Sequence, residues 1–303
     1  MKILVTGAAG MLASSVVPEL VQNGHRAFGS TPSVIGTDIN LRLPEVRKMD
    51  VTNLTEVDEY VRKTEPDFIF HLAAETDVDL CEQDPDHAFR TNTLGTENVA
   101  LACQKHDVPM LYISTAGVFY GDKPEPYTEM DEPRPANVYG VSKLFGELAV
   151  KQFLGRFFIV RAGWMVGGWD IDKKFVYKIV RKLKNGEKLI RVVSDKFGSP
   201  SFTKDFAKNL LPLIATQRYG LYHMTNKGSA SRYEIALKIV DLMGLSNTVK
   251  VEPINSAEFP LPAPRARSEA MRNYRLDLLG MNQMPHWEES LERYIRENYS
   301  PRD

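Results

Sequence analysis

The chain has 303 residues, of which 43% are hydrophobic and 25% are charged, a balance typical of globular proteins. Its formal net charge of -1 gives no electrostatic footprint for nucleic acid or for a membrane surface. No run approaches the roughly 18 apolar residues of a membrane-spanning helix. The two isolated cysteines, Cys81 and Cys103, lack metal-ligand spacing and are typical of a reducing cytoplasm. We therefore expect a cytoplasmic protein without a nucleic-acid partner, a membrane partner or a metal site.

A strand, a glycine-rich turn and a helix are the first predicted elements. The apolar segment Lys2–Thr6 leads into Gly7-Ala8-Ala9-Gly10-Met11-Leu12-Ala13, and apolar residues then recur at helical spacing to Val21. Gly7 permits a sharp turn, and Gly10 lets backbone N–H groups approach a pyrophosphate at the helix N-terminus. The spacing is G-x-x-G-x-x-A rather than G-x-G-x-x-G. It predicts dinucleotide binding, with candidate contacts at Gly7, Ala9, Gly10, Met11 and Leu12.

Short apolar runs alternate with helical patterns through the first half of the chain. The predicted strands are Ser33–Asp38, Val46–Asp50, Phe68–Leu72, Met110–Ser114 and Phe157–Val160, and helices are predicted near 56–63, 86–106 and 139–153. Strands buried on both faces and separated by helices predict an α/β fold with a doubly wound, Rossmann-type parallel sheet. Ligands then bind beyond the carboxyl ends of the strands.

The alternating pattern weakens after Gly163. We expect residues 1–163 to form the dinucleotide-binding domain and residues 164–303 to form a smaller C-terminal substrate-binding domain. A segment near 190–225 is expected to return to the first domain. The basic amphipathic helix predicted near 173–186 is interpreted as a solvated face.

Tyr139 and Lys143 are the candidate catalytic pair. Residues four apart share one face of a helix, so the phenol and the ammonium are expected side by side. A neighbouring cation lowers the pKa of a phenol from its ordinary value near ~10, which favours proton exchange near neutral pH. The lysine can also hydrogen-bond to the ribose of a nicotinamide nucleotide. Thr115, at the end of an apolar strand, offers a hydroxyl to the substrate oxygen.

On these motifs the chain resembles the extended short-chain dehydrogenase/reductase family. The matching elements are Thr6 to Ala13, His71-Leu72-Ala73-Ala74, Asn92, Ser114-Thr115, and Tyr139 with Lys143. The resemblance implies a catalytic triad of Thr115, Tyr139 and Lys143. It also implies cofactor contacts at Asp50 near the adenine, and at Val51, Leu72, Ala73, Ala74, Thr76, Asn92, Ser114, Tyr139 and Lys143. Asn92 would support an active-site water network, or is simply a buried helix asparagine.

The second half resembles the dTDP-4-dehydrorhamnose reductase family more specifically. The similarity rests on Ala162-Gly163-Trp164, Asp195 to Pro200, Gly220 to His223, and Glu258 to Arg265. It implies that the nucleotide-sugar contacts Thr115, Ala116, Trp164, Phe197, Ser199, Pro200 and Arg265. An arginine in a proline-stiffened loop suits a diphosphate, because its planar fork forms paired charged hydrogen bonds.

Departures from the family pattern leave the sugar and the nucleotide base open. Those reductases usually read Ser-Thr-Asp-Tyr-Val-Phe, whereas this chain has Ser114-Thr115-Ala116-Gly117-Val118-Phe119. Val166 stands where a tyrosine is common after the tryptophan. The absence of an acidic residue at Ala116 and Gly117 argues against a 4,6-dehydratase.

The choice between NADH and NADPH depends on which segment forms the second strand. Asp38 after Ser33–Thr37 resembles the acid that bonds the adenosine ribose and selects NAD, although it comes 31 residues after Gly7, where ~20 is usual. In a rival register Arg26–Thr31 is the strand, and Ser30, Thr31 and Ser33 receive a 2′-phosphate. We favour NADH and expect NADPH to work as well.

The resemblance implies hydride transfer to C4 of a nucleotide-linked 4-keto-6-deoxy sugar. The alternatives are a nucleotide-sugar epimerase of the same family, and a non-catalytic regulatory subunit similar to the beta subunit of methionine adenosyltransferase. The intact triad disfavours the second alternative. A homodimer is expected from base rates alone.

Overall fold

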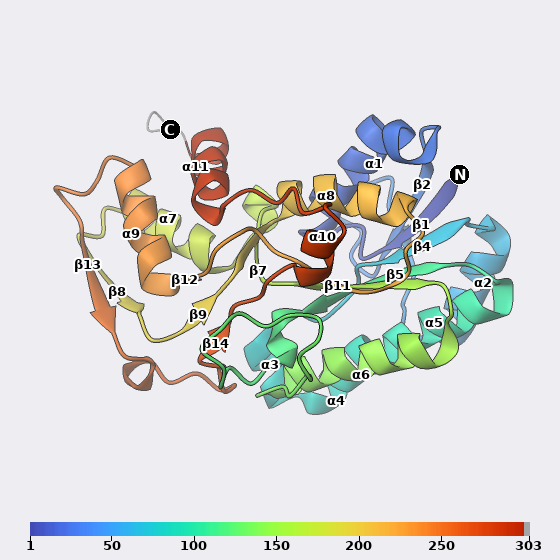
Figure 1. Cartoon of the computed structure of the whole chain (residues 1–303), viewed down its shortest axis with the longest axis horizontal. Coiled ribbons are helices and arrows are strands. Elements are labelled where there is room, and N and C mark those ends of the chain that lie inside the picture. Colours follow the sequence, from blue (N-terminus) through green and yellow to red (C-terminus); the bar gives the residue numbers. More distant parts are fainter. Residues whose placement is uncertain (300–303) are drawn as a thin grey trace.

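Seven parallel strands form the main sheet of the computed structural model, which describes residues 1–299 (Figure 1). Their order across the sheet is β3-β2-β1-β4-β5-β6-β11. The predicted doubly wound parallel sheet is confirmed. The strands are β1 (Lys2–Thr6), β2 (Ser33–Asp38), β3 (Arg47–Lys48), β4 (Phe68–His71), β5 (Met110–Thr115), β6 (Phe157–Ala162) and β11 (Gly220–Met224).

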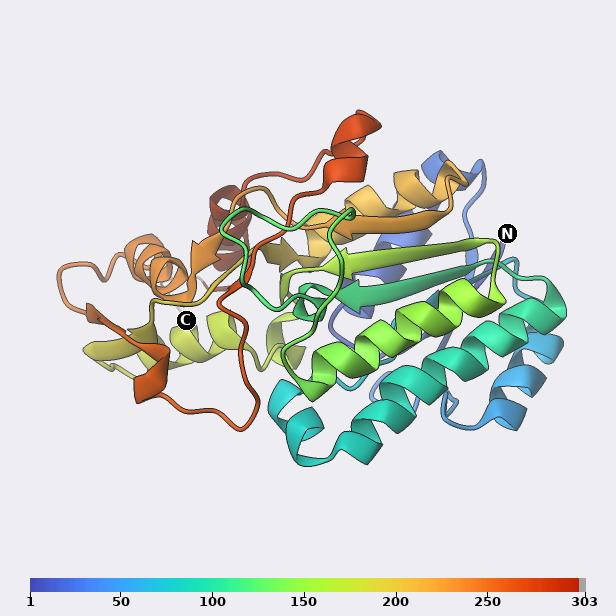
Figure 2. The same ribbon diagram turned by 60° about the horizontal axis from the view of Figure 1, so that its bottom comes forward.

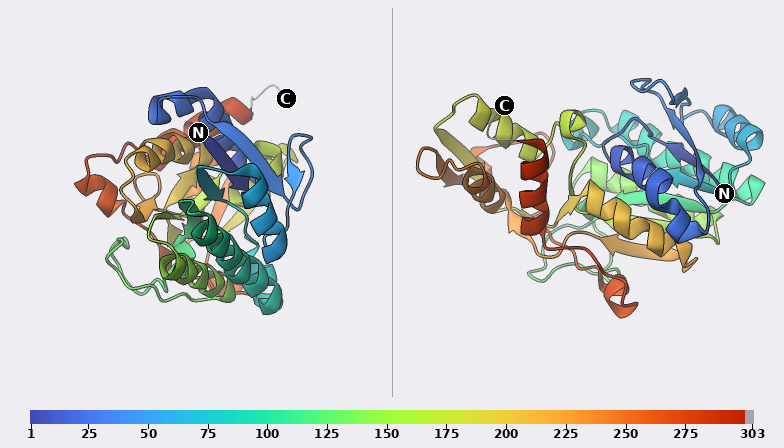
Figure 3. Two further views of the ribbon diagram at one scale, coloured as in Figure 1. Left: turned by 90° about the vertical axis from the view of Figure 1, so that its right-hand side faces the viewer. Right: turned by 90° about the horizontal axis from the view of Figure 1, so that it is seen from above.

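Alternating side chains of the inner strands face two separate helix layers. In β1, Ile3 and Val5 pack with α1 (Ala13–Phe28) and α8 (Thr203–Ala215), whereas Leu4 belongs to the core on the opposite face. That opposite face is covered by α2 (Leu54–Thr64), α5 (Gly95–His106) and α6 (Val138–Phe153). Figure 2 shows α5 and α6 running side by side along the sheet, and Figure 3 shows α1 and α8 on the other side. This two-sided burial explains the continuous apolar runs of the strands.

Two predicted elements differ in the structure. The predicted helix 86–106 is divided into α4 (Pro85–Ala88), a π-helical turn (Phe89–Leu94) and α5, and it follows an unpredicted helix, α3 (Val78–Gln83). The alternative prediction that Arg26–Thr31 forms the second strand is wrong. Helix α1 continues through Arg26 to Phe28 and ends at Gly29, whose φ is 76°. The strand beside β1 is therefore Ser33–Asp38.

A smaller unit lies beside the carboxyl ends of the strands and has its own core (Figure 1). Ile179, Ile239 and Leu291 come from three helices that share this core, namely α7 (Phe175–Lys184), α9 (Arg232–Leu242) and α11 (Trp287–Asn298). Its strands pair as β7 (Trp164–Val166) with β10 (Pro200–Phe202), β8 (Leu189–Val193) with β13 (Lys250–Ile254), and β9 (Phe197–Gly198) with both β12 (Ala230–Ser231) and β14 (Ser268–Glu269). A short helix, α10 (Tyr274–Leu278), contacts β11.

The chain passes between the two units more than once. β8, β9 and β10 belong to the smaller unit, whereas α8 and β11 pack into the main sheet. The division of the chain at residue 163 stays a proposal. No helix among residues 1–299 is long and apolar enough to cross a membrane.

Candidate active site

The glycine turn after β1 lies at the point where the strand order reverses. Gly7 has φ of 70°, and a Cβ there would stand 2.5 Å from the backbone nitrogen of Ala73, in the loop after β4. The Gly10 N–H donates to the Gly7 carbonyl at 3.0 Å. Open α/β sheets bind ligands where neighbouring connections leave to opposite faces, as those after β1 and β4 do here. The turn thus forms a backbone-lined cradle at the expected place, with Met11 and Leu12 leading into α1.

Asp38 ends β2 and is tied to the same turn. Its carboxylate accepts hydrogen bonds from the backbone N–H groups of Ala9, at 3.0 Å, and Asn40, at 2.8 Å. The backbone N–H of Ala8 donates to the carbonyl of Thr37. The acid therefore lies beside the glycine turn despite its late position in the sequence.

The other predicted cofactor residues follow the ends of β3 and β4. Asp50 accepts hydrogen bonds from the backbone and hydroxyl of Thr52, and Val51 is buried against Gly95. Leu72, Ala73 and Ala74 are half-buried in the loop after β4, and Thr76 is exposed.

Asn92 lies fully buried in the π-helical turn, where its amide is occupied by protein groups. Its Nδ2 donates to the carbonyl of Glu75 and to Oγ of Ser142, both at 3.0 Å, and its Oδ1 accepts from the Glu75 N–H. The side chain joins the loop after β4 to α6. These contacts are those of a buried structural asparagine.

Thr115, Tyr139 and Lys143 meet where β5 ends and α6 begins. Thr115 Oγ1 accepts from the Gly117 N–H at 3.0 Å, and the Thr115 side chain is near enough to the Tyr139 phenol to lower its pKa. A Cβ on Gly117 would lie 3.3 Å from Thr115 Oγ1 and 3.5 Å from the Tyr139 ring. Ala116, predicted to contact the sugar, is buried in the short turn between them. The backbone of Gly117 therefore lies close to both side chains, and glycine at this position lets the threonine and the tyrosine lie near each other.

Burial controls the acid–base properties of the cluster. Burial raises the pKa of Tyr139 to about 12, although the neighbouring Thr115 side chain acts in the opposite direction. Burial also lowers the pKa of Lys143 to about 7, against the attraction of Glu147. Lys143 Nζ stands 4.2 Å from the centroid of the Tyr112 ring. The expectation that the lysine lowers the pKa of the tyrosine is not met in the free protein, because desolvation is the largest influence on the phenol and Lys143 is not among the main ones.

The predicted sugar-binding residues divide into open and buried groups. Trp164 is half-exposed, and its indole packs on the backbone of Gly198, next to the exposed Phe197. Ser199 is fully buried and hydrogen-bonds with the backbone of Met271, and Pro200 is buried as well. Trp164 and Phe197 are thus accessible to a ligand, whereas Ser199 and Pro200 are buried in the protein next to them.

Arg265 forms a salt bridge with a residue of the unit that contains the main sheet. Its guanidinium lies 2.9 Å from the carboxylate of Asp79 on α3, and Asp79 also accepts from the Ala263 N–H. Asn137, at the start of α6, donates to the carbonyl of Pro264. The proline-rich loop is therefore fastened beside the first turn of α6, one turn or less from Tyr139.

Arg232 and Glu269 were not predicted from the sequence. The Arg232 guanidinium lies 3.6 Å from the centroid of the Trp164 ring, and the Trp164 indole N–H donates to Glu269. Burial lowers the pKa of Arg232 to about 10, and the negative charge of Glu269, the next largest influence, opposes this change. Arg232 forms no salt bridge with any of the side chains that the structure describes, and its nearest aromatic contact is the Trp164 ring. The only local signal was the capping pattern Ser231-x-x-Glu234, which places Arg232 at a helix start but says nothing of its partner.

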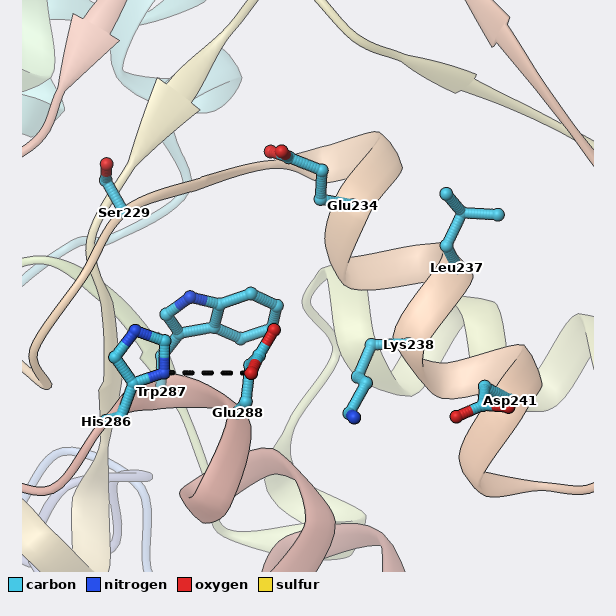
Figure 4. A pocket seen from close by; sticks show the side chains of 8 residues that line it. All are labelled: Ser229, Glu234, Leu237, Lys238, Asp241, His286, Trp287 and Glu288. Atoms are coloured by element: carbon cyan, nitrogen blue, oxygen red, sulfur yellow. Dashed lines mark ion pairs between the residues drawn. The ribbon is translucent and has the colours of Figure 1, made fainter.

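A pocket of about 480 Å³ lies elsewhere, between α9 and the start of α11 (Figure 4). Its lining mixes both charge signs, and His286 stands 3.9 Å from Glu288. None of the predicted site residues belongs to it, so we assign it no part in the chemistry. The lining residues are Ser229, Glu234, Leu237, Lys238, Asp241, His286, Trp287 and Glu288.

Comparison with known proteins identifies the family. A model of the family described as "RmlD substrate binding domain" matches residues 1–300. The chain belongs to this family, a branch of the extended short-chain dehydrogenase/reductases. It is 32% identical over 295 residues to a dTDP-4-dehydrorhamnose reductase of Mycobacterium tuberculosis, covering 96% of this chain and 91% of the relative.

Two crystal structures show the same likeness in three dimensions. The dTDP-4-dehydrorhamnose reductase of Clostridium acetobutylicum is 35% identical, with a TM-score of 0.89 and coverage of 98% of this chain and 99% of that one. The Bacillus anthracis enzyme of the same name, in complex with NADP, is 37% identical, with a TM-score of 0.88 and the same coverage. The likeness therefore extends over both units of the fold.

Proposed function

We propose that this chain is an NAD(P)H-dependent reductase of a nucleotide-linked 4-keto-6-deoxy sugar, with dTDP-4-dehydrorhamnose as the first substrate to test. The observation that carries the proposal is the meeting of Thr115, Tyr139 and Lys143 at the carboxyl edge of the sheet that also bears the glycine cradle. Full-length similarity to enzymes named dTDP-4-dehydrorhamnose reductase supports this substrate over an epimerase or a regulatory subunit.

A nicotinamide dinucleotide fits the cradle after β1. Gly7 leaves no room for a Cβ, so its backbone can approach a pyrophosphate closely, and Asp38 stands beside it at the end of β2. Asp38 supports NADH, whereas the Bacillus anthracis relative was solved with NADP. Because of Asp38 we keep NADH as the preferred cofactor. Because of the relative solved with NADP, we expect NADPH to be accepted as well.

In the proposed reaction, the bound nicotinamide supplies a hydride to the C4 carbonyl carbon of the sugar. Thr115 orients the carbonyl oxygen through its hydroxyl. Tyr139 donates its phenolic proton to that oxygen as negative charge develops on it. The positive charge of Lys143 favours the tyrosinate that remains, and its ammonium can hold the ribose hydroxyls. The products are the 4-hydroxy sugar and the oxidised nicotinamide.

The nucleotide-sugar would lie between Trp164 and the proline-rich loop. Phe197 and Trp164 offer apolar surface, and the Arg232 guanidinium, which stacks on the Trp164 ring near Glu269, can donate to a diphosphate oxygen. Arg265 would exchange its contact with Asp79 for the diphosphate.

The test mixes the purified protein with the dTDP-4-keto sugar and either NADH or NADPH, follows the nicotinamide absorbance, and identifies the sugar product. Stoichiometric cofactor oxidation with formation of a 4-hydroxy sugar supports a reductase. An isomerised sugar without net cofactor oxidation would indicate an epimerase. No turnover on any keto-sugar, together with capture of a partner enzyme, would favour the regulatory role.

The cellular setting belongs to the same proposal. We expect a cytoplasmic homodimer, because two-fold dimers are the commonest oligomers and because Cys81 and Cys103 are free and buried. Sedimentation at the mass of one chain would contradict the dimer.

A further inference from the structure

A buried ion pair lies next to the Thr115–Tyr139–Lys143 cluster. The Glu147 and Arg161 side chains are 0% and 1% exposed. Arg161 donates from Nε to Oε1 at 2.8 Å and from Nη2 to Oε2 at 2.7 Å. The hydroxyl of Ser114 adds a third hydrogen bond to Oε1, at 2.6 Å. This carboxylate therefore joins α6 to the ends of β5 and β6, where Ser114 and Arg161 are register partners.

Glu147 also stands one helical turn after Lys143. Tyr139, Lys143 and Glu147 are spaced by four residues along α6, so their side chains follow one face of the helix. Opposite charges at this spacing attract, and the attraction is strong where water is excluded. Burial alone drives the Lys143 ammonium toward its neutral form, and Glu147 is the main influence that opposes this change in pKa.

The remaining groups that face Lys143 carry no comparable charge. Burial lowers the pKa of His71 on β4 to about 3, so this imidazole is neutral at physiological pH. Burial raises the pKa of Cys81 on α3 to about 12, so this thiol is neutral as well. Tyr112 on β5 contributes a ring face, and the phenol of Tyr139 is protonated.

We propose that Glu147 is a positioning residue that keeps the Lys143 ammonium charged and fixes the ends of β5 and β6 against α6. A buried ion pair is weak evidence for stability, because apolar residues of similar size often serve as well. A pair beside a buried lysine has a second effect, because its carboxylate attracts the lysine ammonium and so raises the pKa of the lysine. The inference rests on the proposed function only where it concerns turnover.

The first experiment measures the charge of Lys143 without any substrate. The full chain is labelled with ¹³C at the lysine Cε, and the Lys143 signal is assigned by its loss in Lys143→Arg. In wild type we expect a titration midpoint near the pKa of about 7. In Glu147→Gln the midpoint should fall by about one pH unit or more, because a close opposite charge typically shifts a pKa by about that amount. Glu147→Asp, which keeps the charge, should restore most of the difference.

Two further variants separate charge from folding. Lys151→Gln removes a cation that stands 3.7 Å from Glu147 and is 39% exposed, and it should leave the Lys143 midpoint unchanged or slightly raised. The double variant Glu147→Gln/Arg161→Met removes both buried charges together, so it avoids leaving an unpaired guanidinium if the single variant does not fold. Its midpoint should also fall below that of wild type, but by less than in Glu147→Gln, because the Arg161 cation is removed together with the carboxylate.

The second experiment measures kcat/KM against pH. If reduction requires the protonated lysine, activity falls as the pH rises through the Lys143 pKa, so Glu147→Gln should move this falling limb to lower pH. An unchanged Lys143 midpoint in folded Glu147→Gln, or in the folded double variant, would overturn the proposal and leave the pair a purely structural contact. The NMR result does not depend on turnover, whereas inactivity of the wild type would count against the proposed function alone.

Discussion

Replacing Gly140 by alanine should displace the proposed catalytic tyrosine without touching it. Gly140 follows Tyr139 in the first turn of α6, and a Cβ there would lie 2.1 Å from the carbonyl oxygen of Gly117 and 2.8 Å from Cβ of Pro135. Ordinary contact begins at 3.4 Å, so the helix start and the turn after β5 must separate by about 1 Å. The blocking atom belongs to the backbone and cannot rotate away.

Two opposing effects decide the outcome for this variant. Alanine in place of glycine inside a helix gains about 1 kcal/mol, whereas overpacking costs about 1–3 kcal/mol, so we expect a modest net loss of stability. The larger effect is on chemistry, because Thr115 and Tyr139 lie on the two segments that are pushed apart. A misplacement of about 1 Å can cost roughly 10²-fold in rate. We therefore expect kcat to fall by about 10²-fold.

The assay compares kcat, the thermal midpoint and the NADH dissociation constant of wild type, Gly140→Ala and Gly155→Ala. Gly155 follows the same helix, and a Cβ there would meet no heavy atom within 4 Å, so it controls for the glycine-to-alanine change itself. The control should retain wild-type kcat. If Gly140→Ala keeps the wild-type kcat and is as stable as wild type or more so, the close approach of Gly140 to the Gly117 carbonyl is refuted. The proposed catalytic placement of Thr115 and Tyr139, which depends on this approach, is then refuted as well.

Three further outcomes test the proposed roles of individual residues. Tyr139→Phe should lower turnover by ~10²–10⁴-fold with little change in the nicotinamide dissociation constant, and full turnover would contradict its role as proton donor. Asp38→Ala should weaken NADH binding relative to NADPH binding, and an unchanged ratio of the two dissociation constants would remove its role in selection. Arg265→Ala and Arg232→Gln should each raise KM for the dTDP-keto sugar about tenfold or more, since a charged hydrogen bond contributes about 1.5–3 kcal/mol. Loss of NADH binding in either variant, with unchanged affinity for the keto sugar, would mean that the two ligands occupy the opposite sites.

The main sheet could be predicted from the sequence because its signals are local. Ile3, Leu4 and Val5 alternate between two cores, and a strand buried on both faces reads as a continuous apolar run. Gly7 at the end of such a run marks the turn, and its positive φ explains why glycine is needed there. The interruption of the helix before α5 was not predicted. At this interruption Asn92 forms hydrogen bonds with the backbone of Glu75 in the loop after β4, and such a contact between separate segments has no local sequence signal.

The sugar-binding side could be predicted only in part, because its contacts join distant segments. Trp164 was found through resemblance, but its neighbours Arg232 and Glu269 are 68 and 105 residues away in sequence. Arginines look alike in a sequence, whatever their side chains contact in the folded chain. Arg265 turned out to be paired with Asp79, whereas Arg232 stacks on an aromatic ring. Only the folded arrangement separates the two cases.

The electrostatics of Tyr139 show why adjacency in a helix does not by itself determine a pKa. The four-residue spacing correctly places Lys143 on the same face, yet burial raises the pKa of the phenol to about 12 and lowers that of the lysine to about 7. This direction suits a reductase. A tyrosine that must give its proton to a developing alkoxide has to be protonated at neutral pH, and a desolvated phenol keeps its proton until a stronger base forms beside it. The lysine then matters most after the transfer, when its charge stabilises the tyrosinate, and this requirement makes the buried carboxylate of Glu147 relevant to the chemistry.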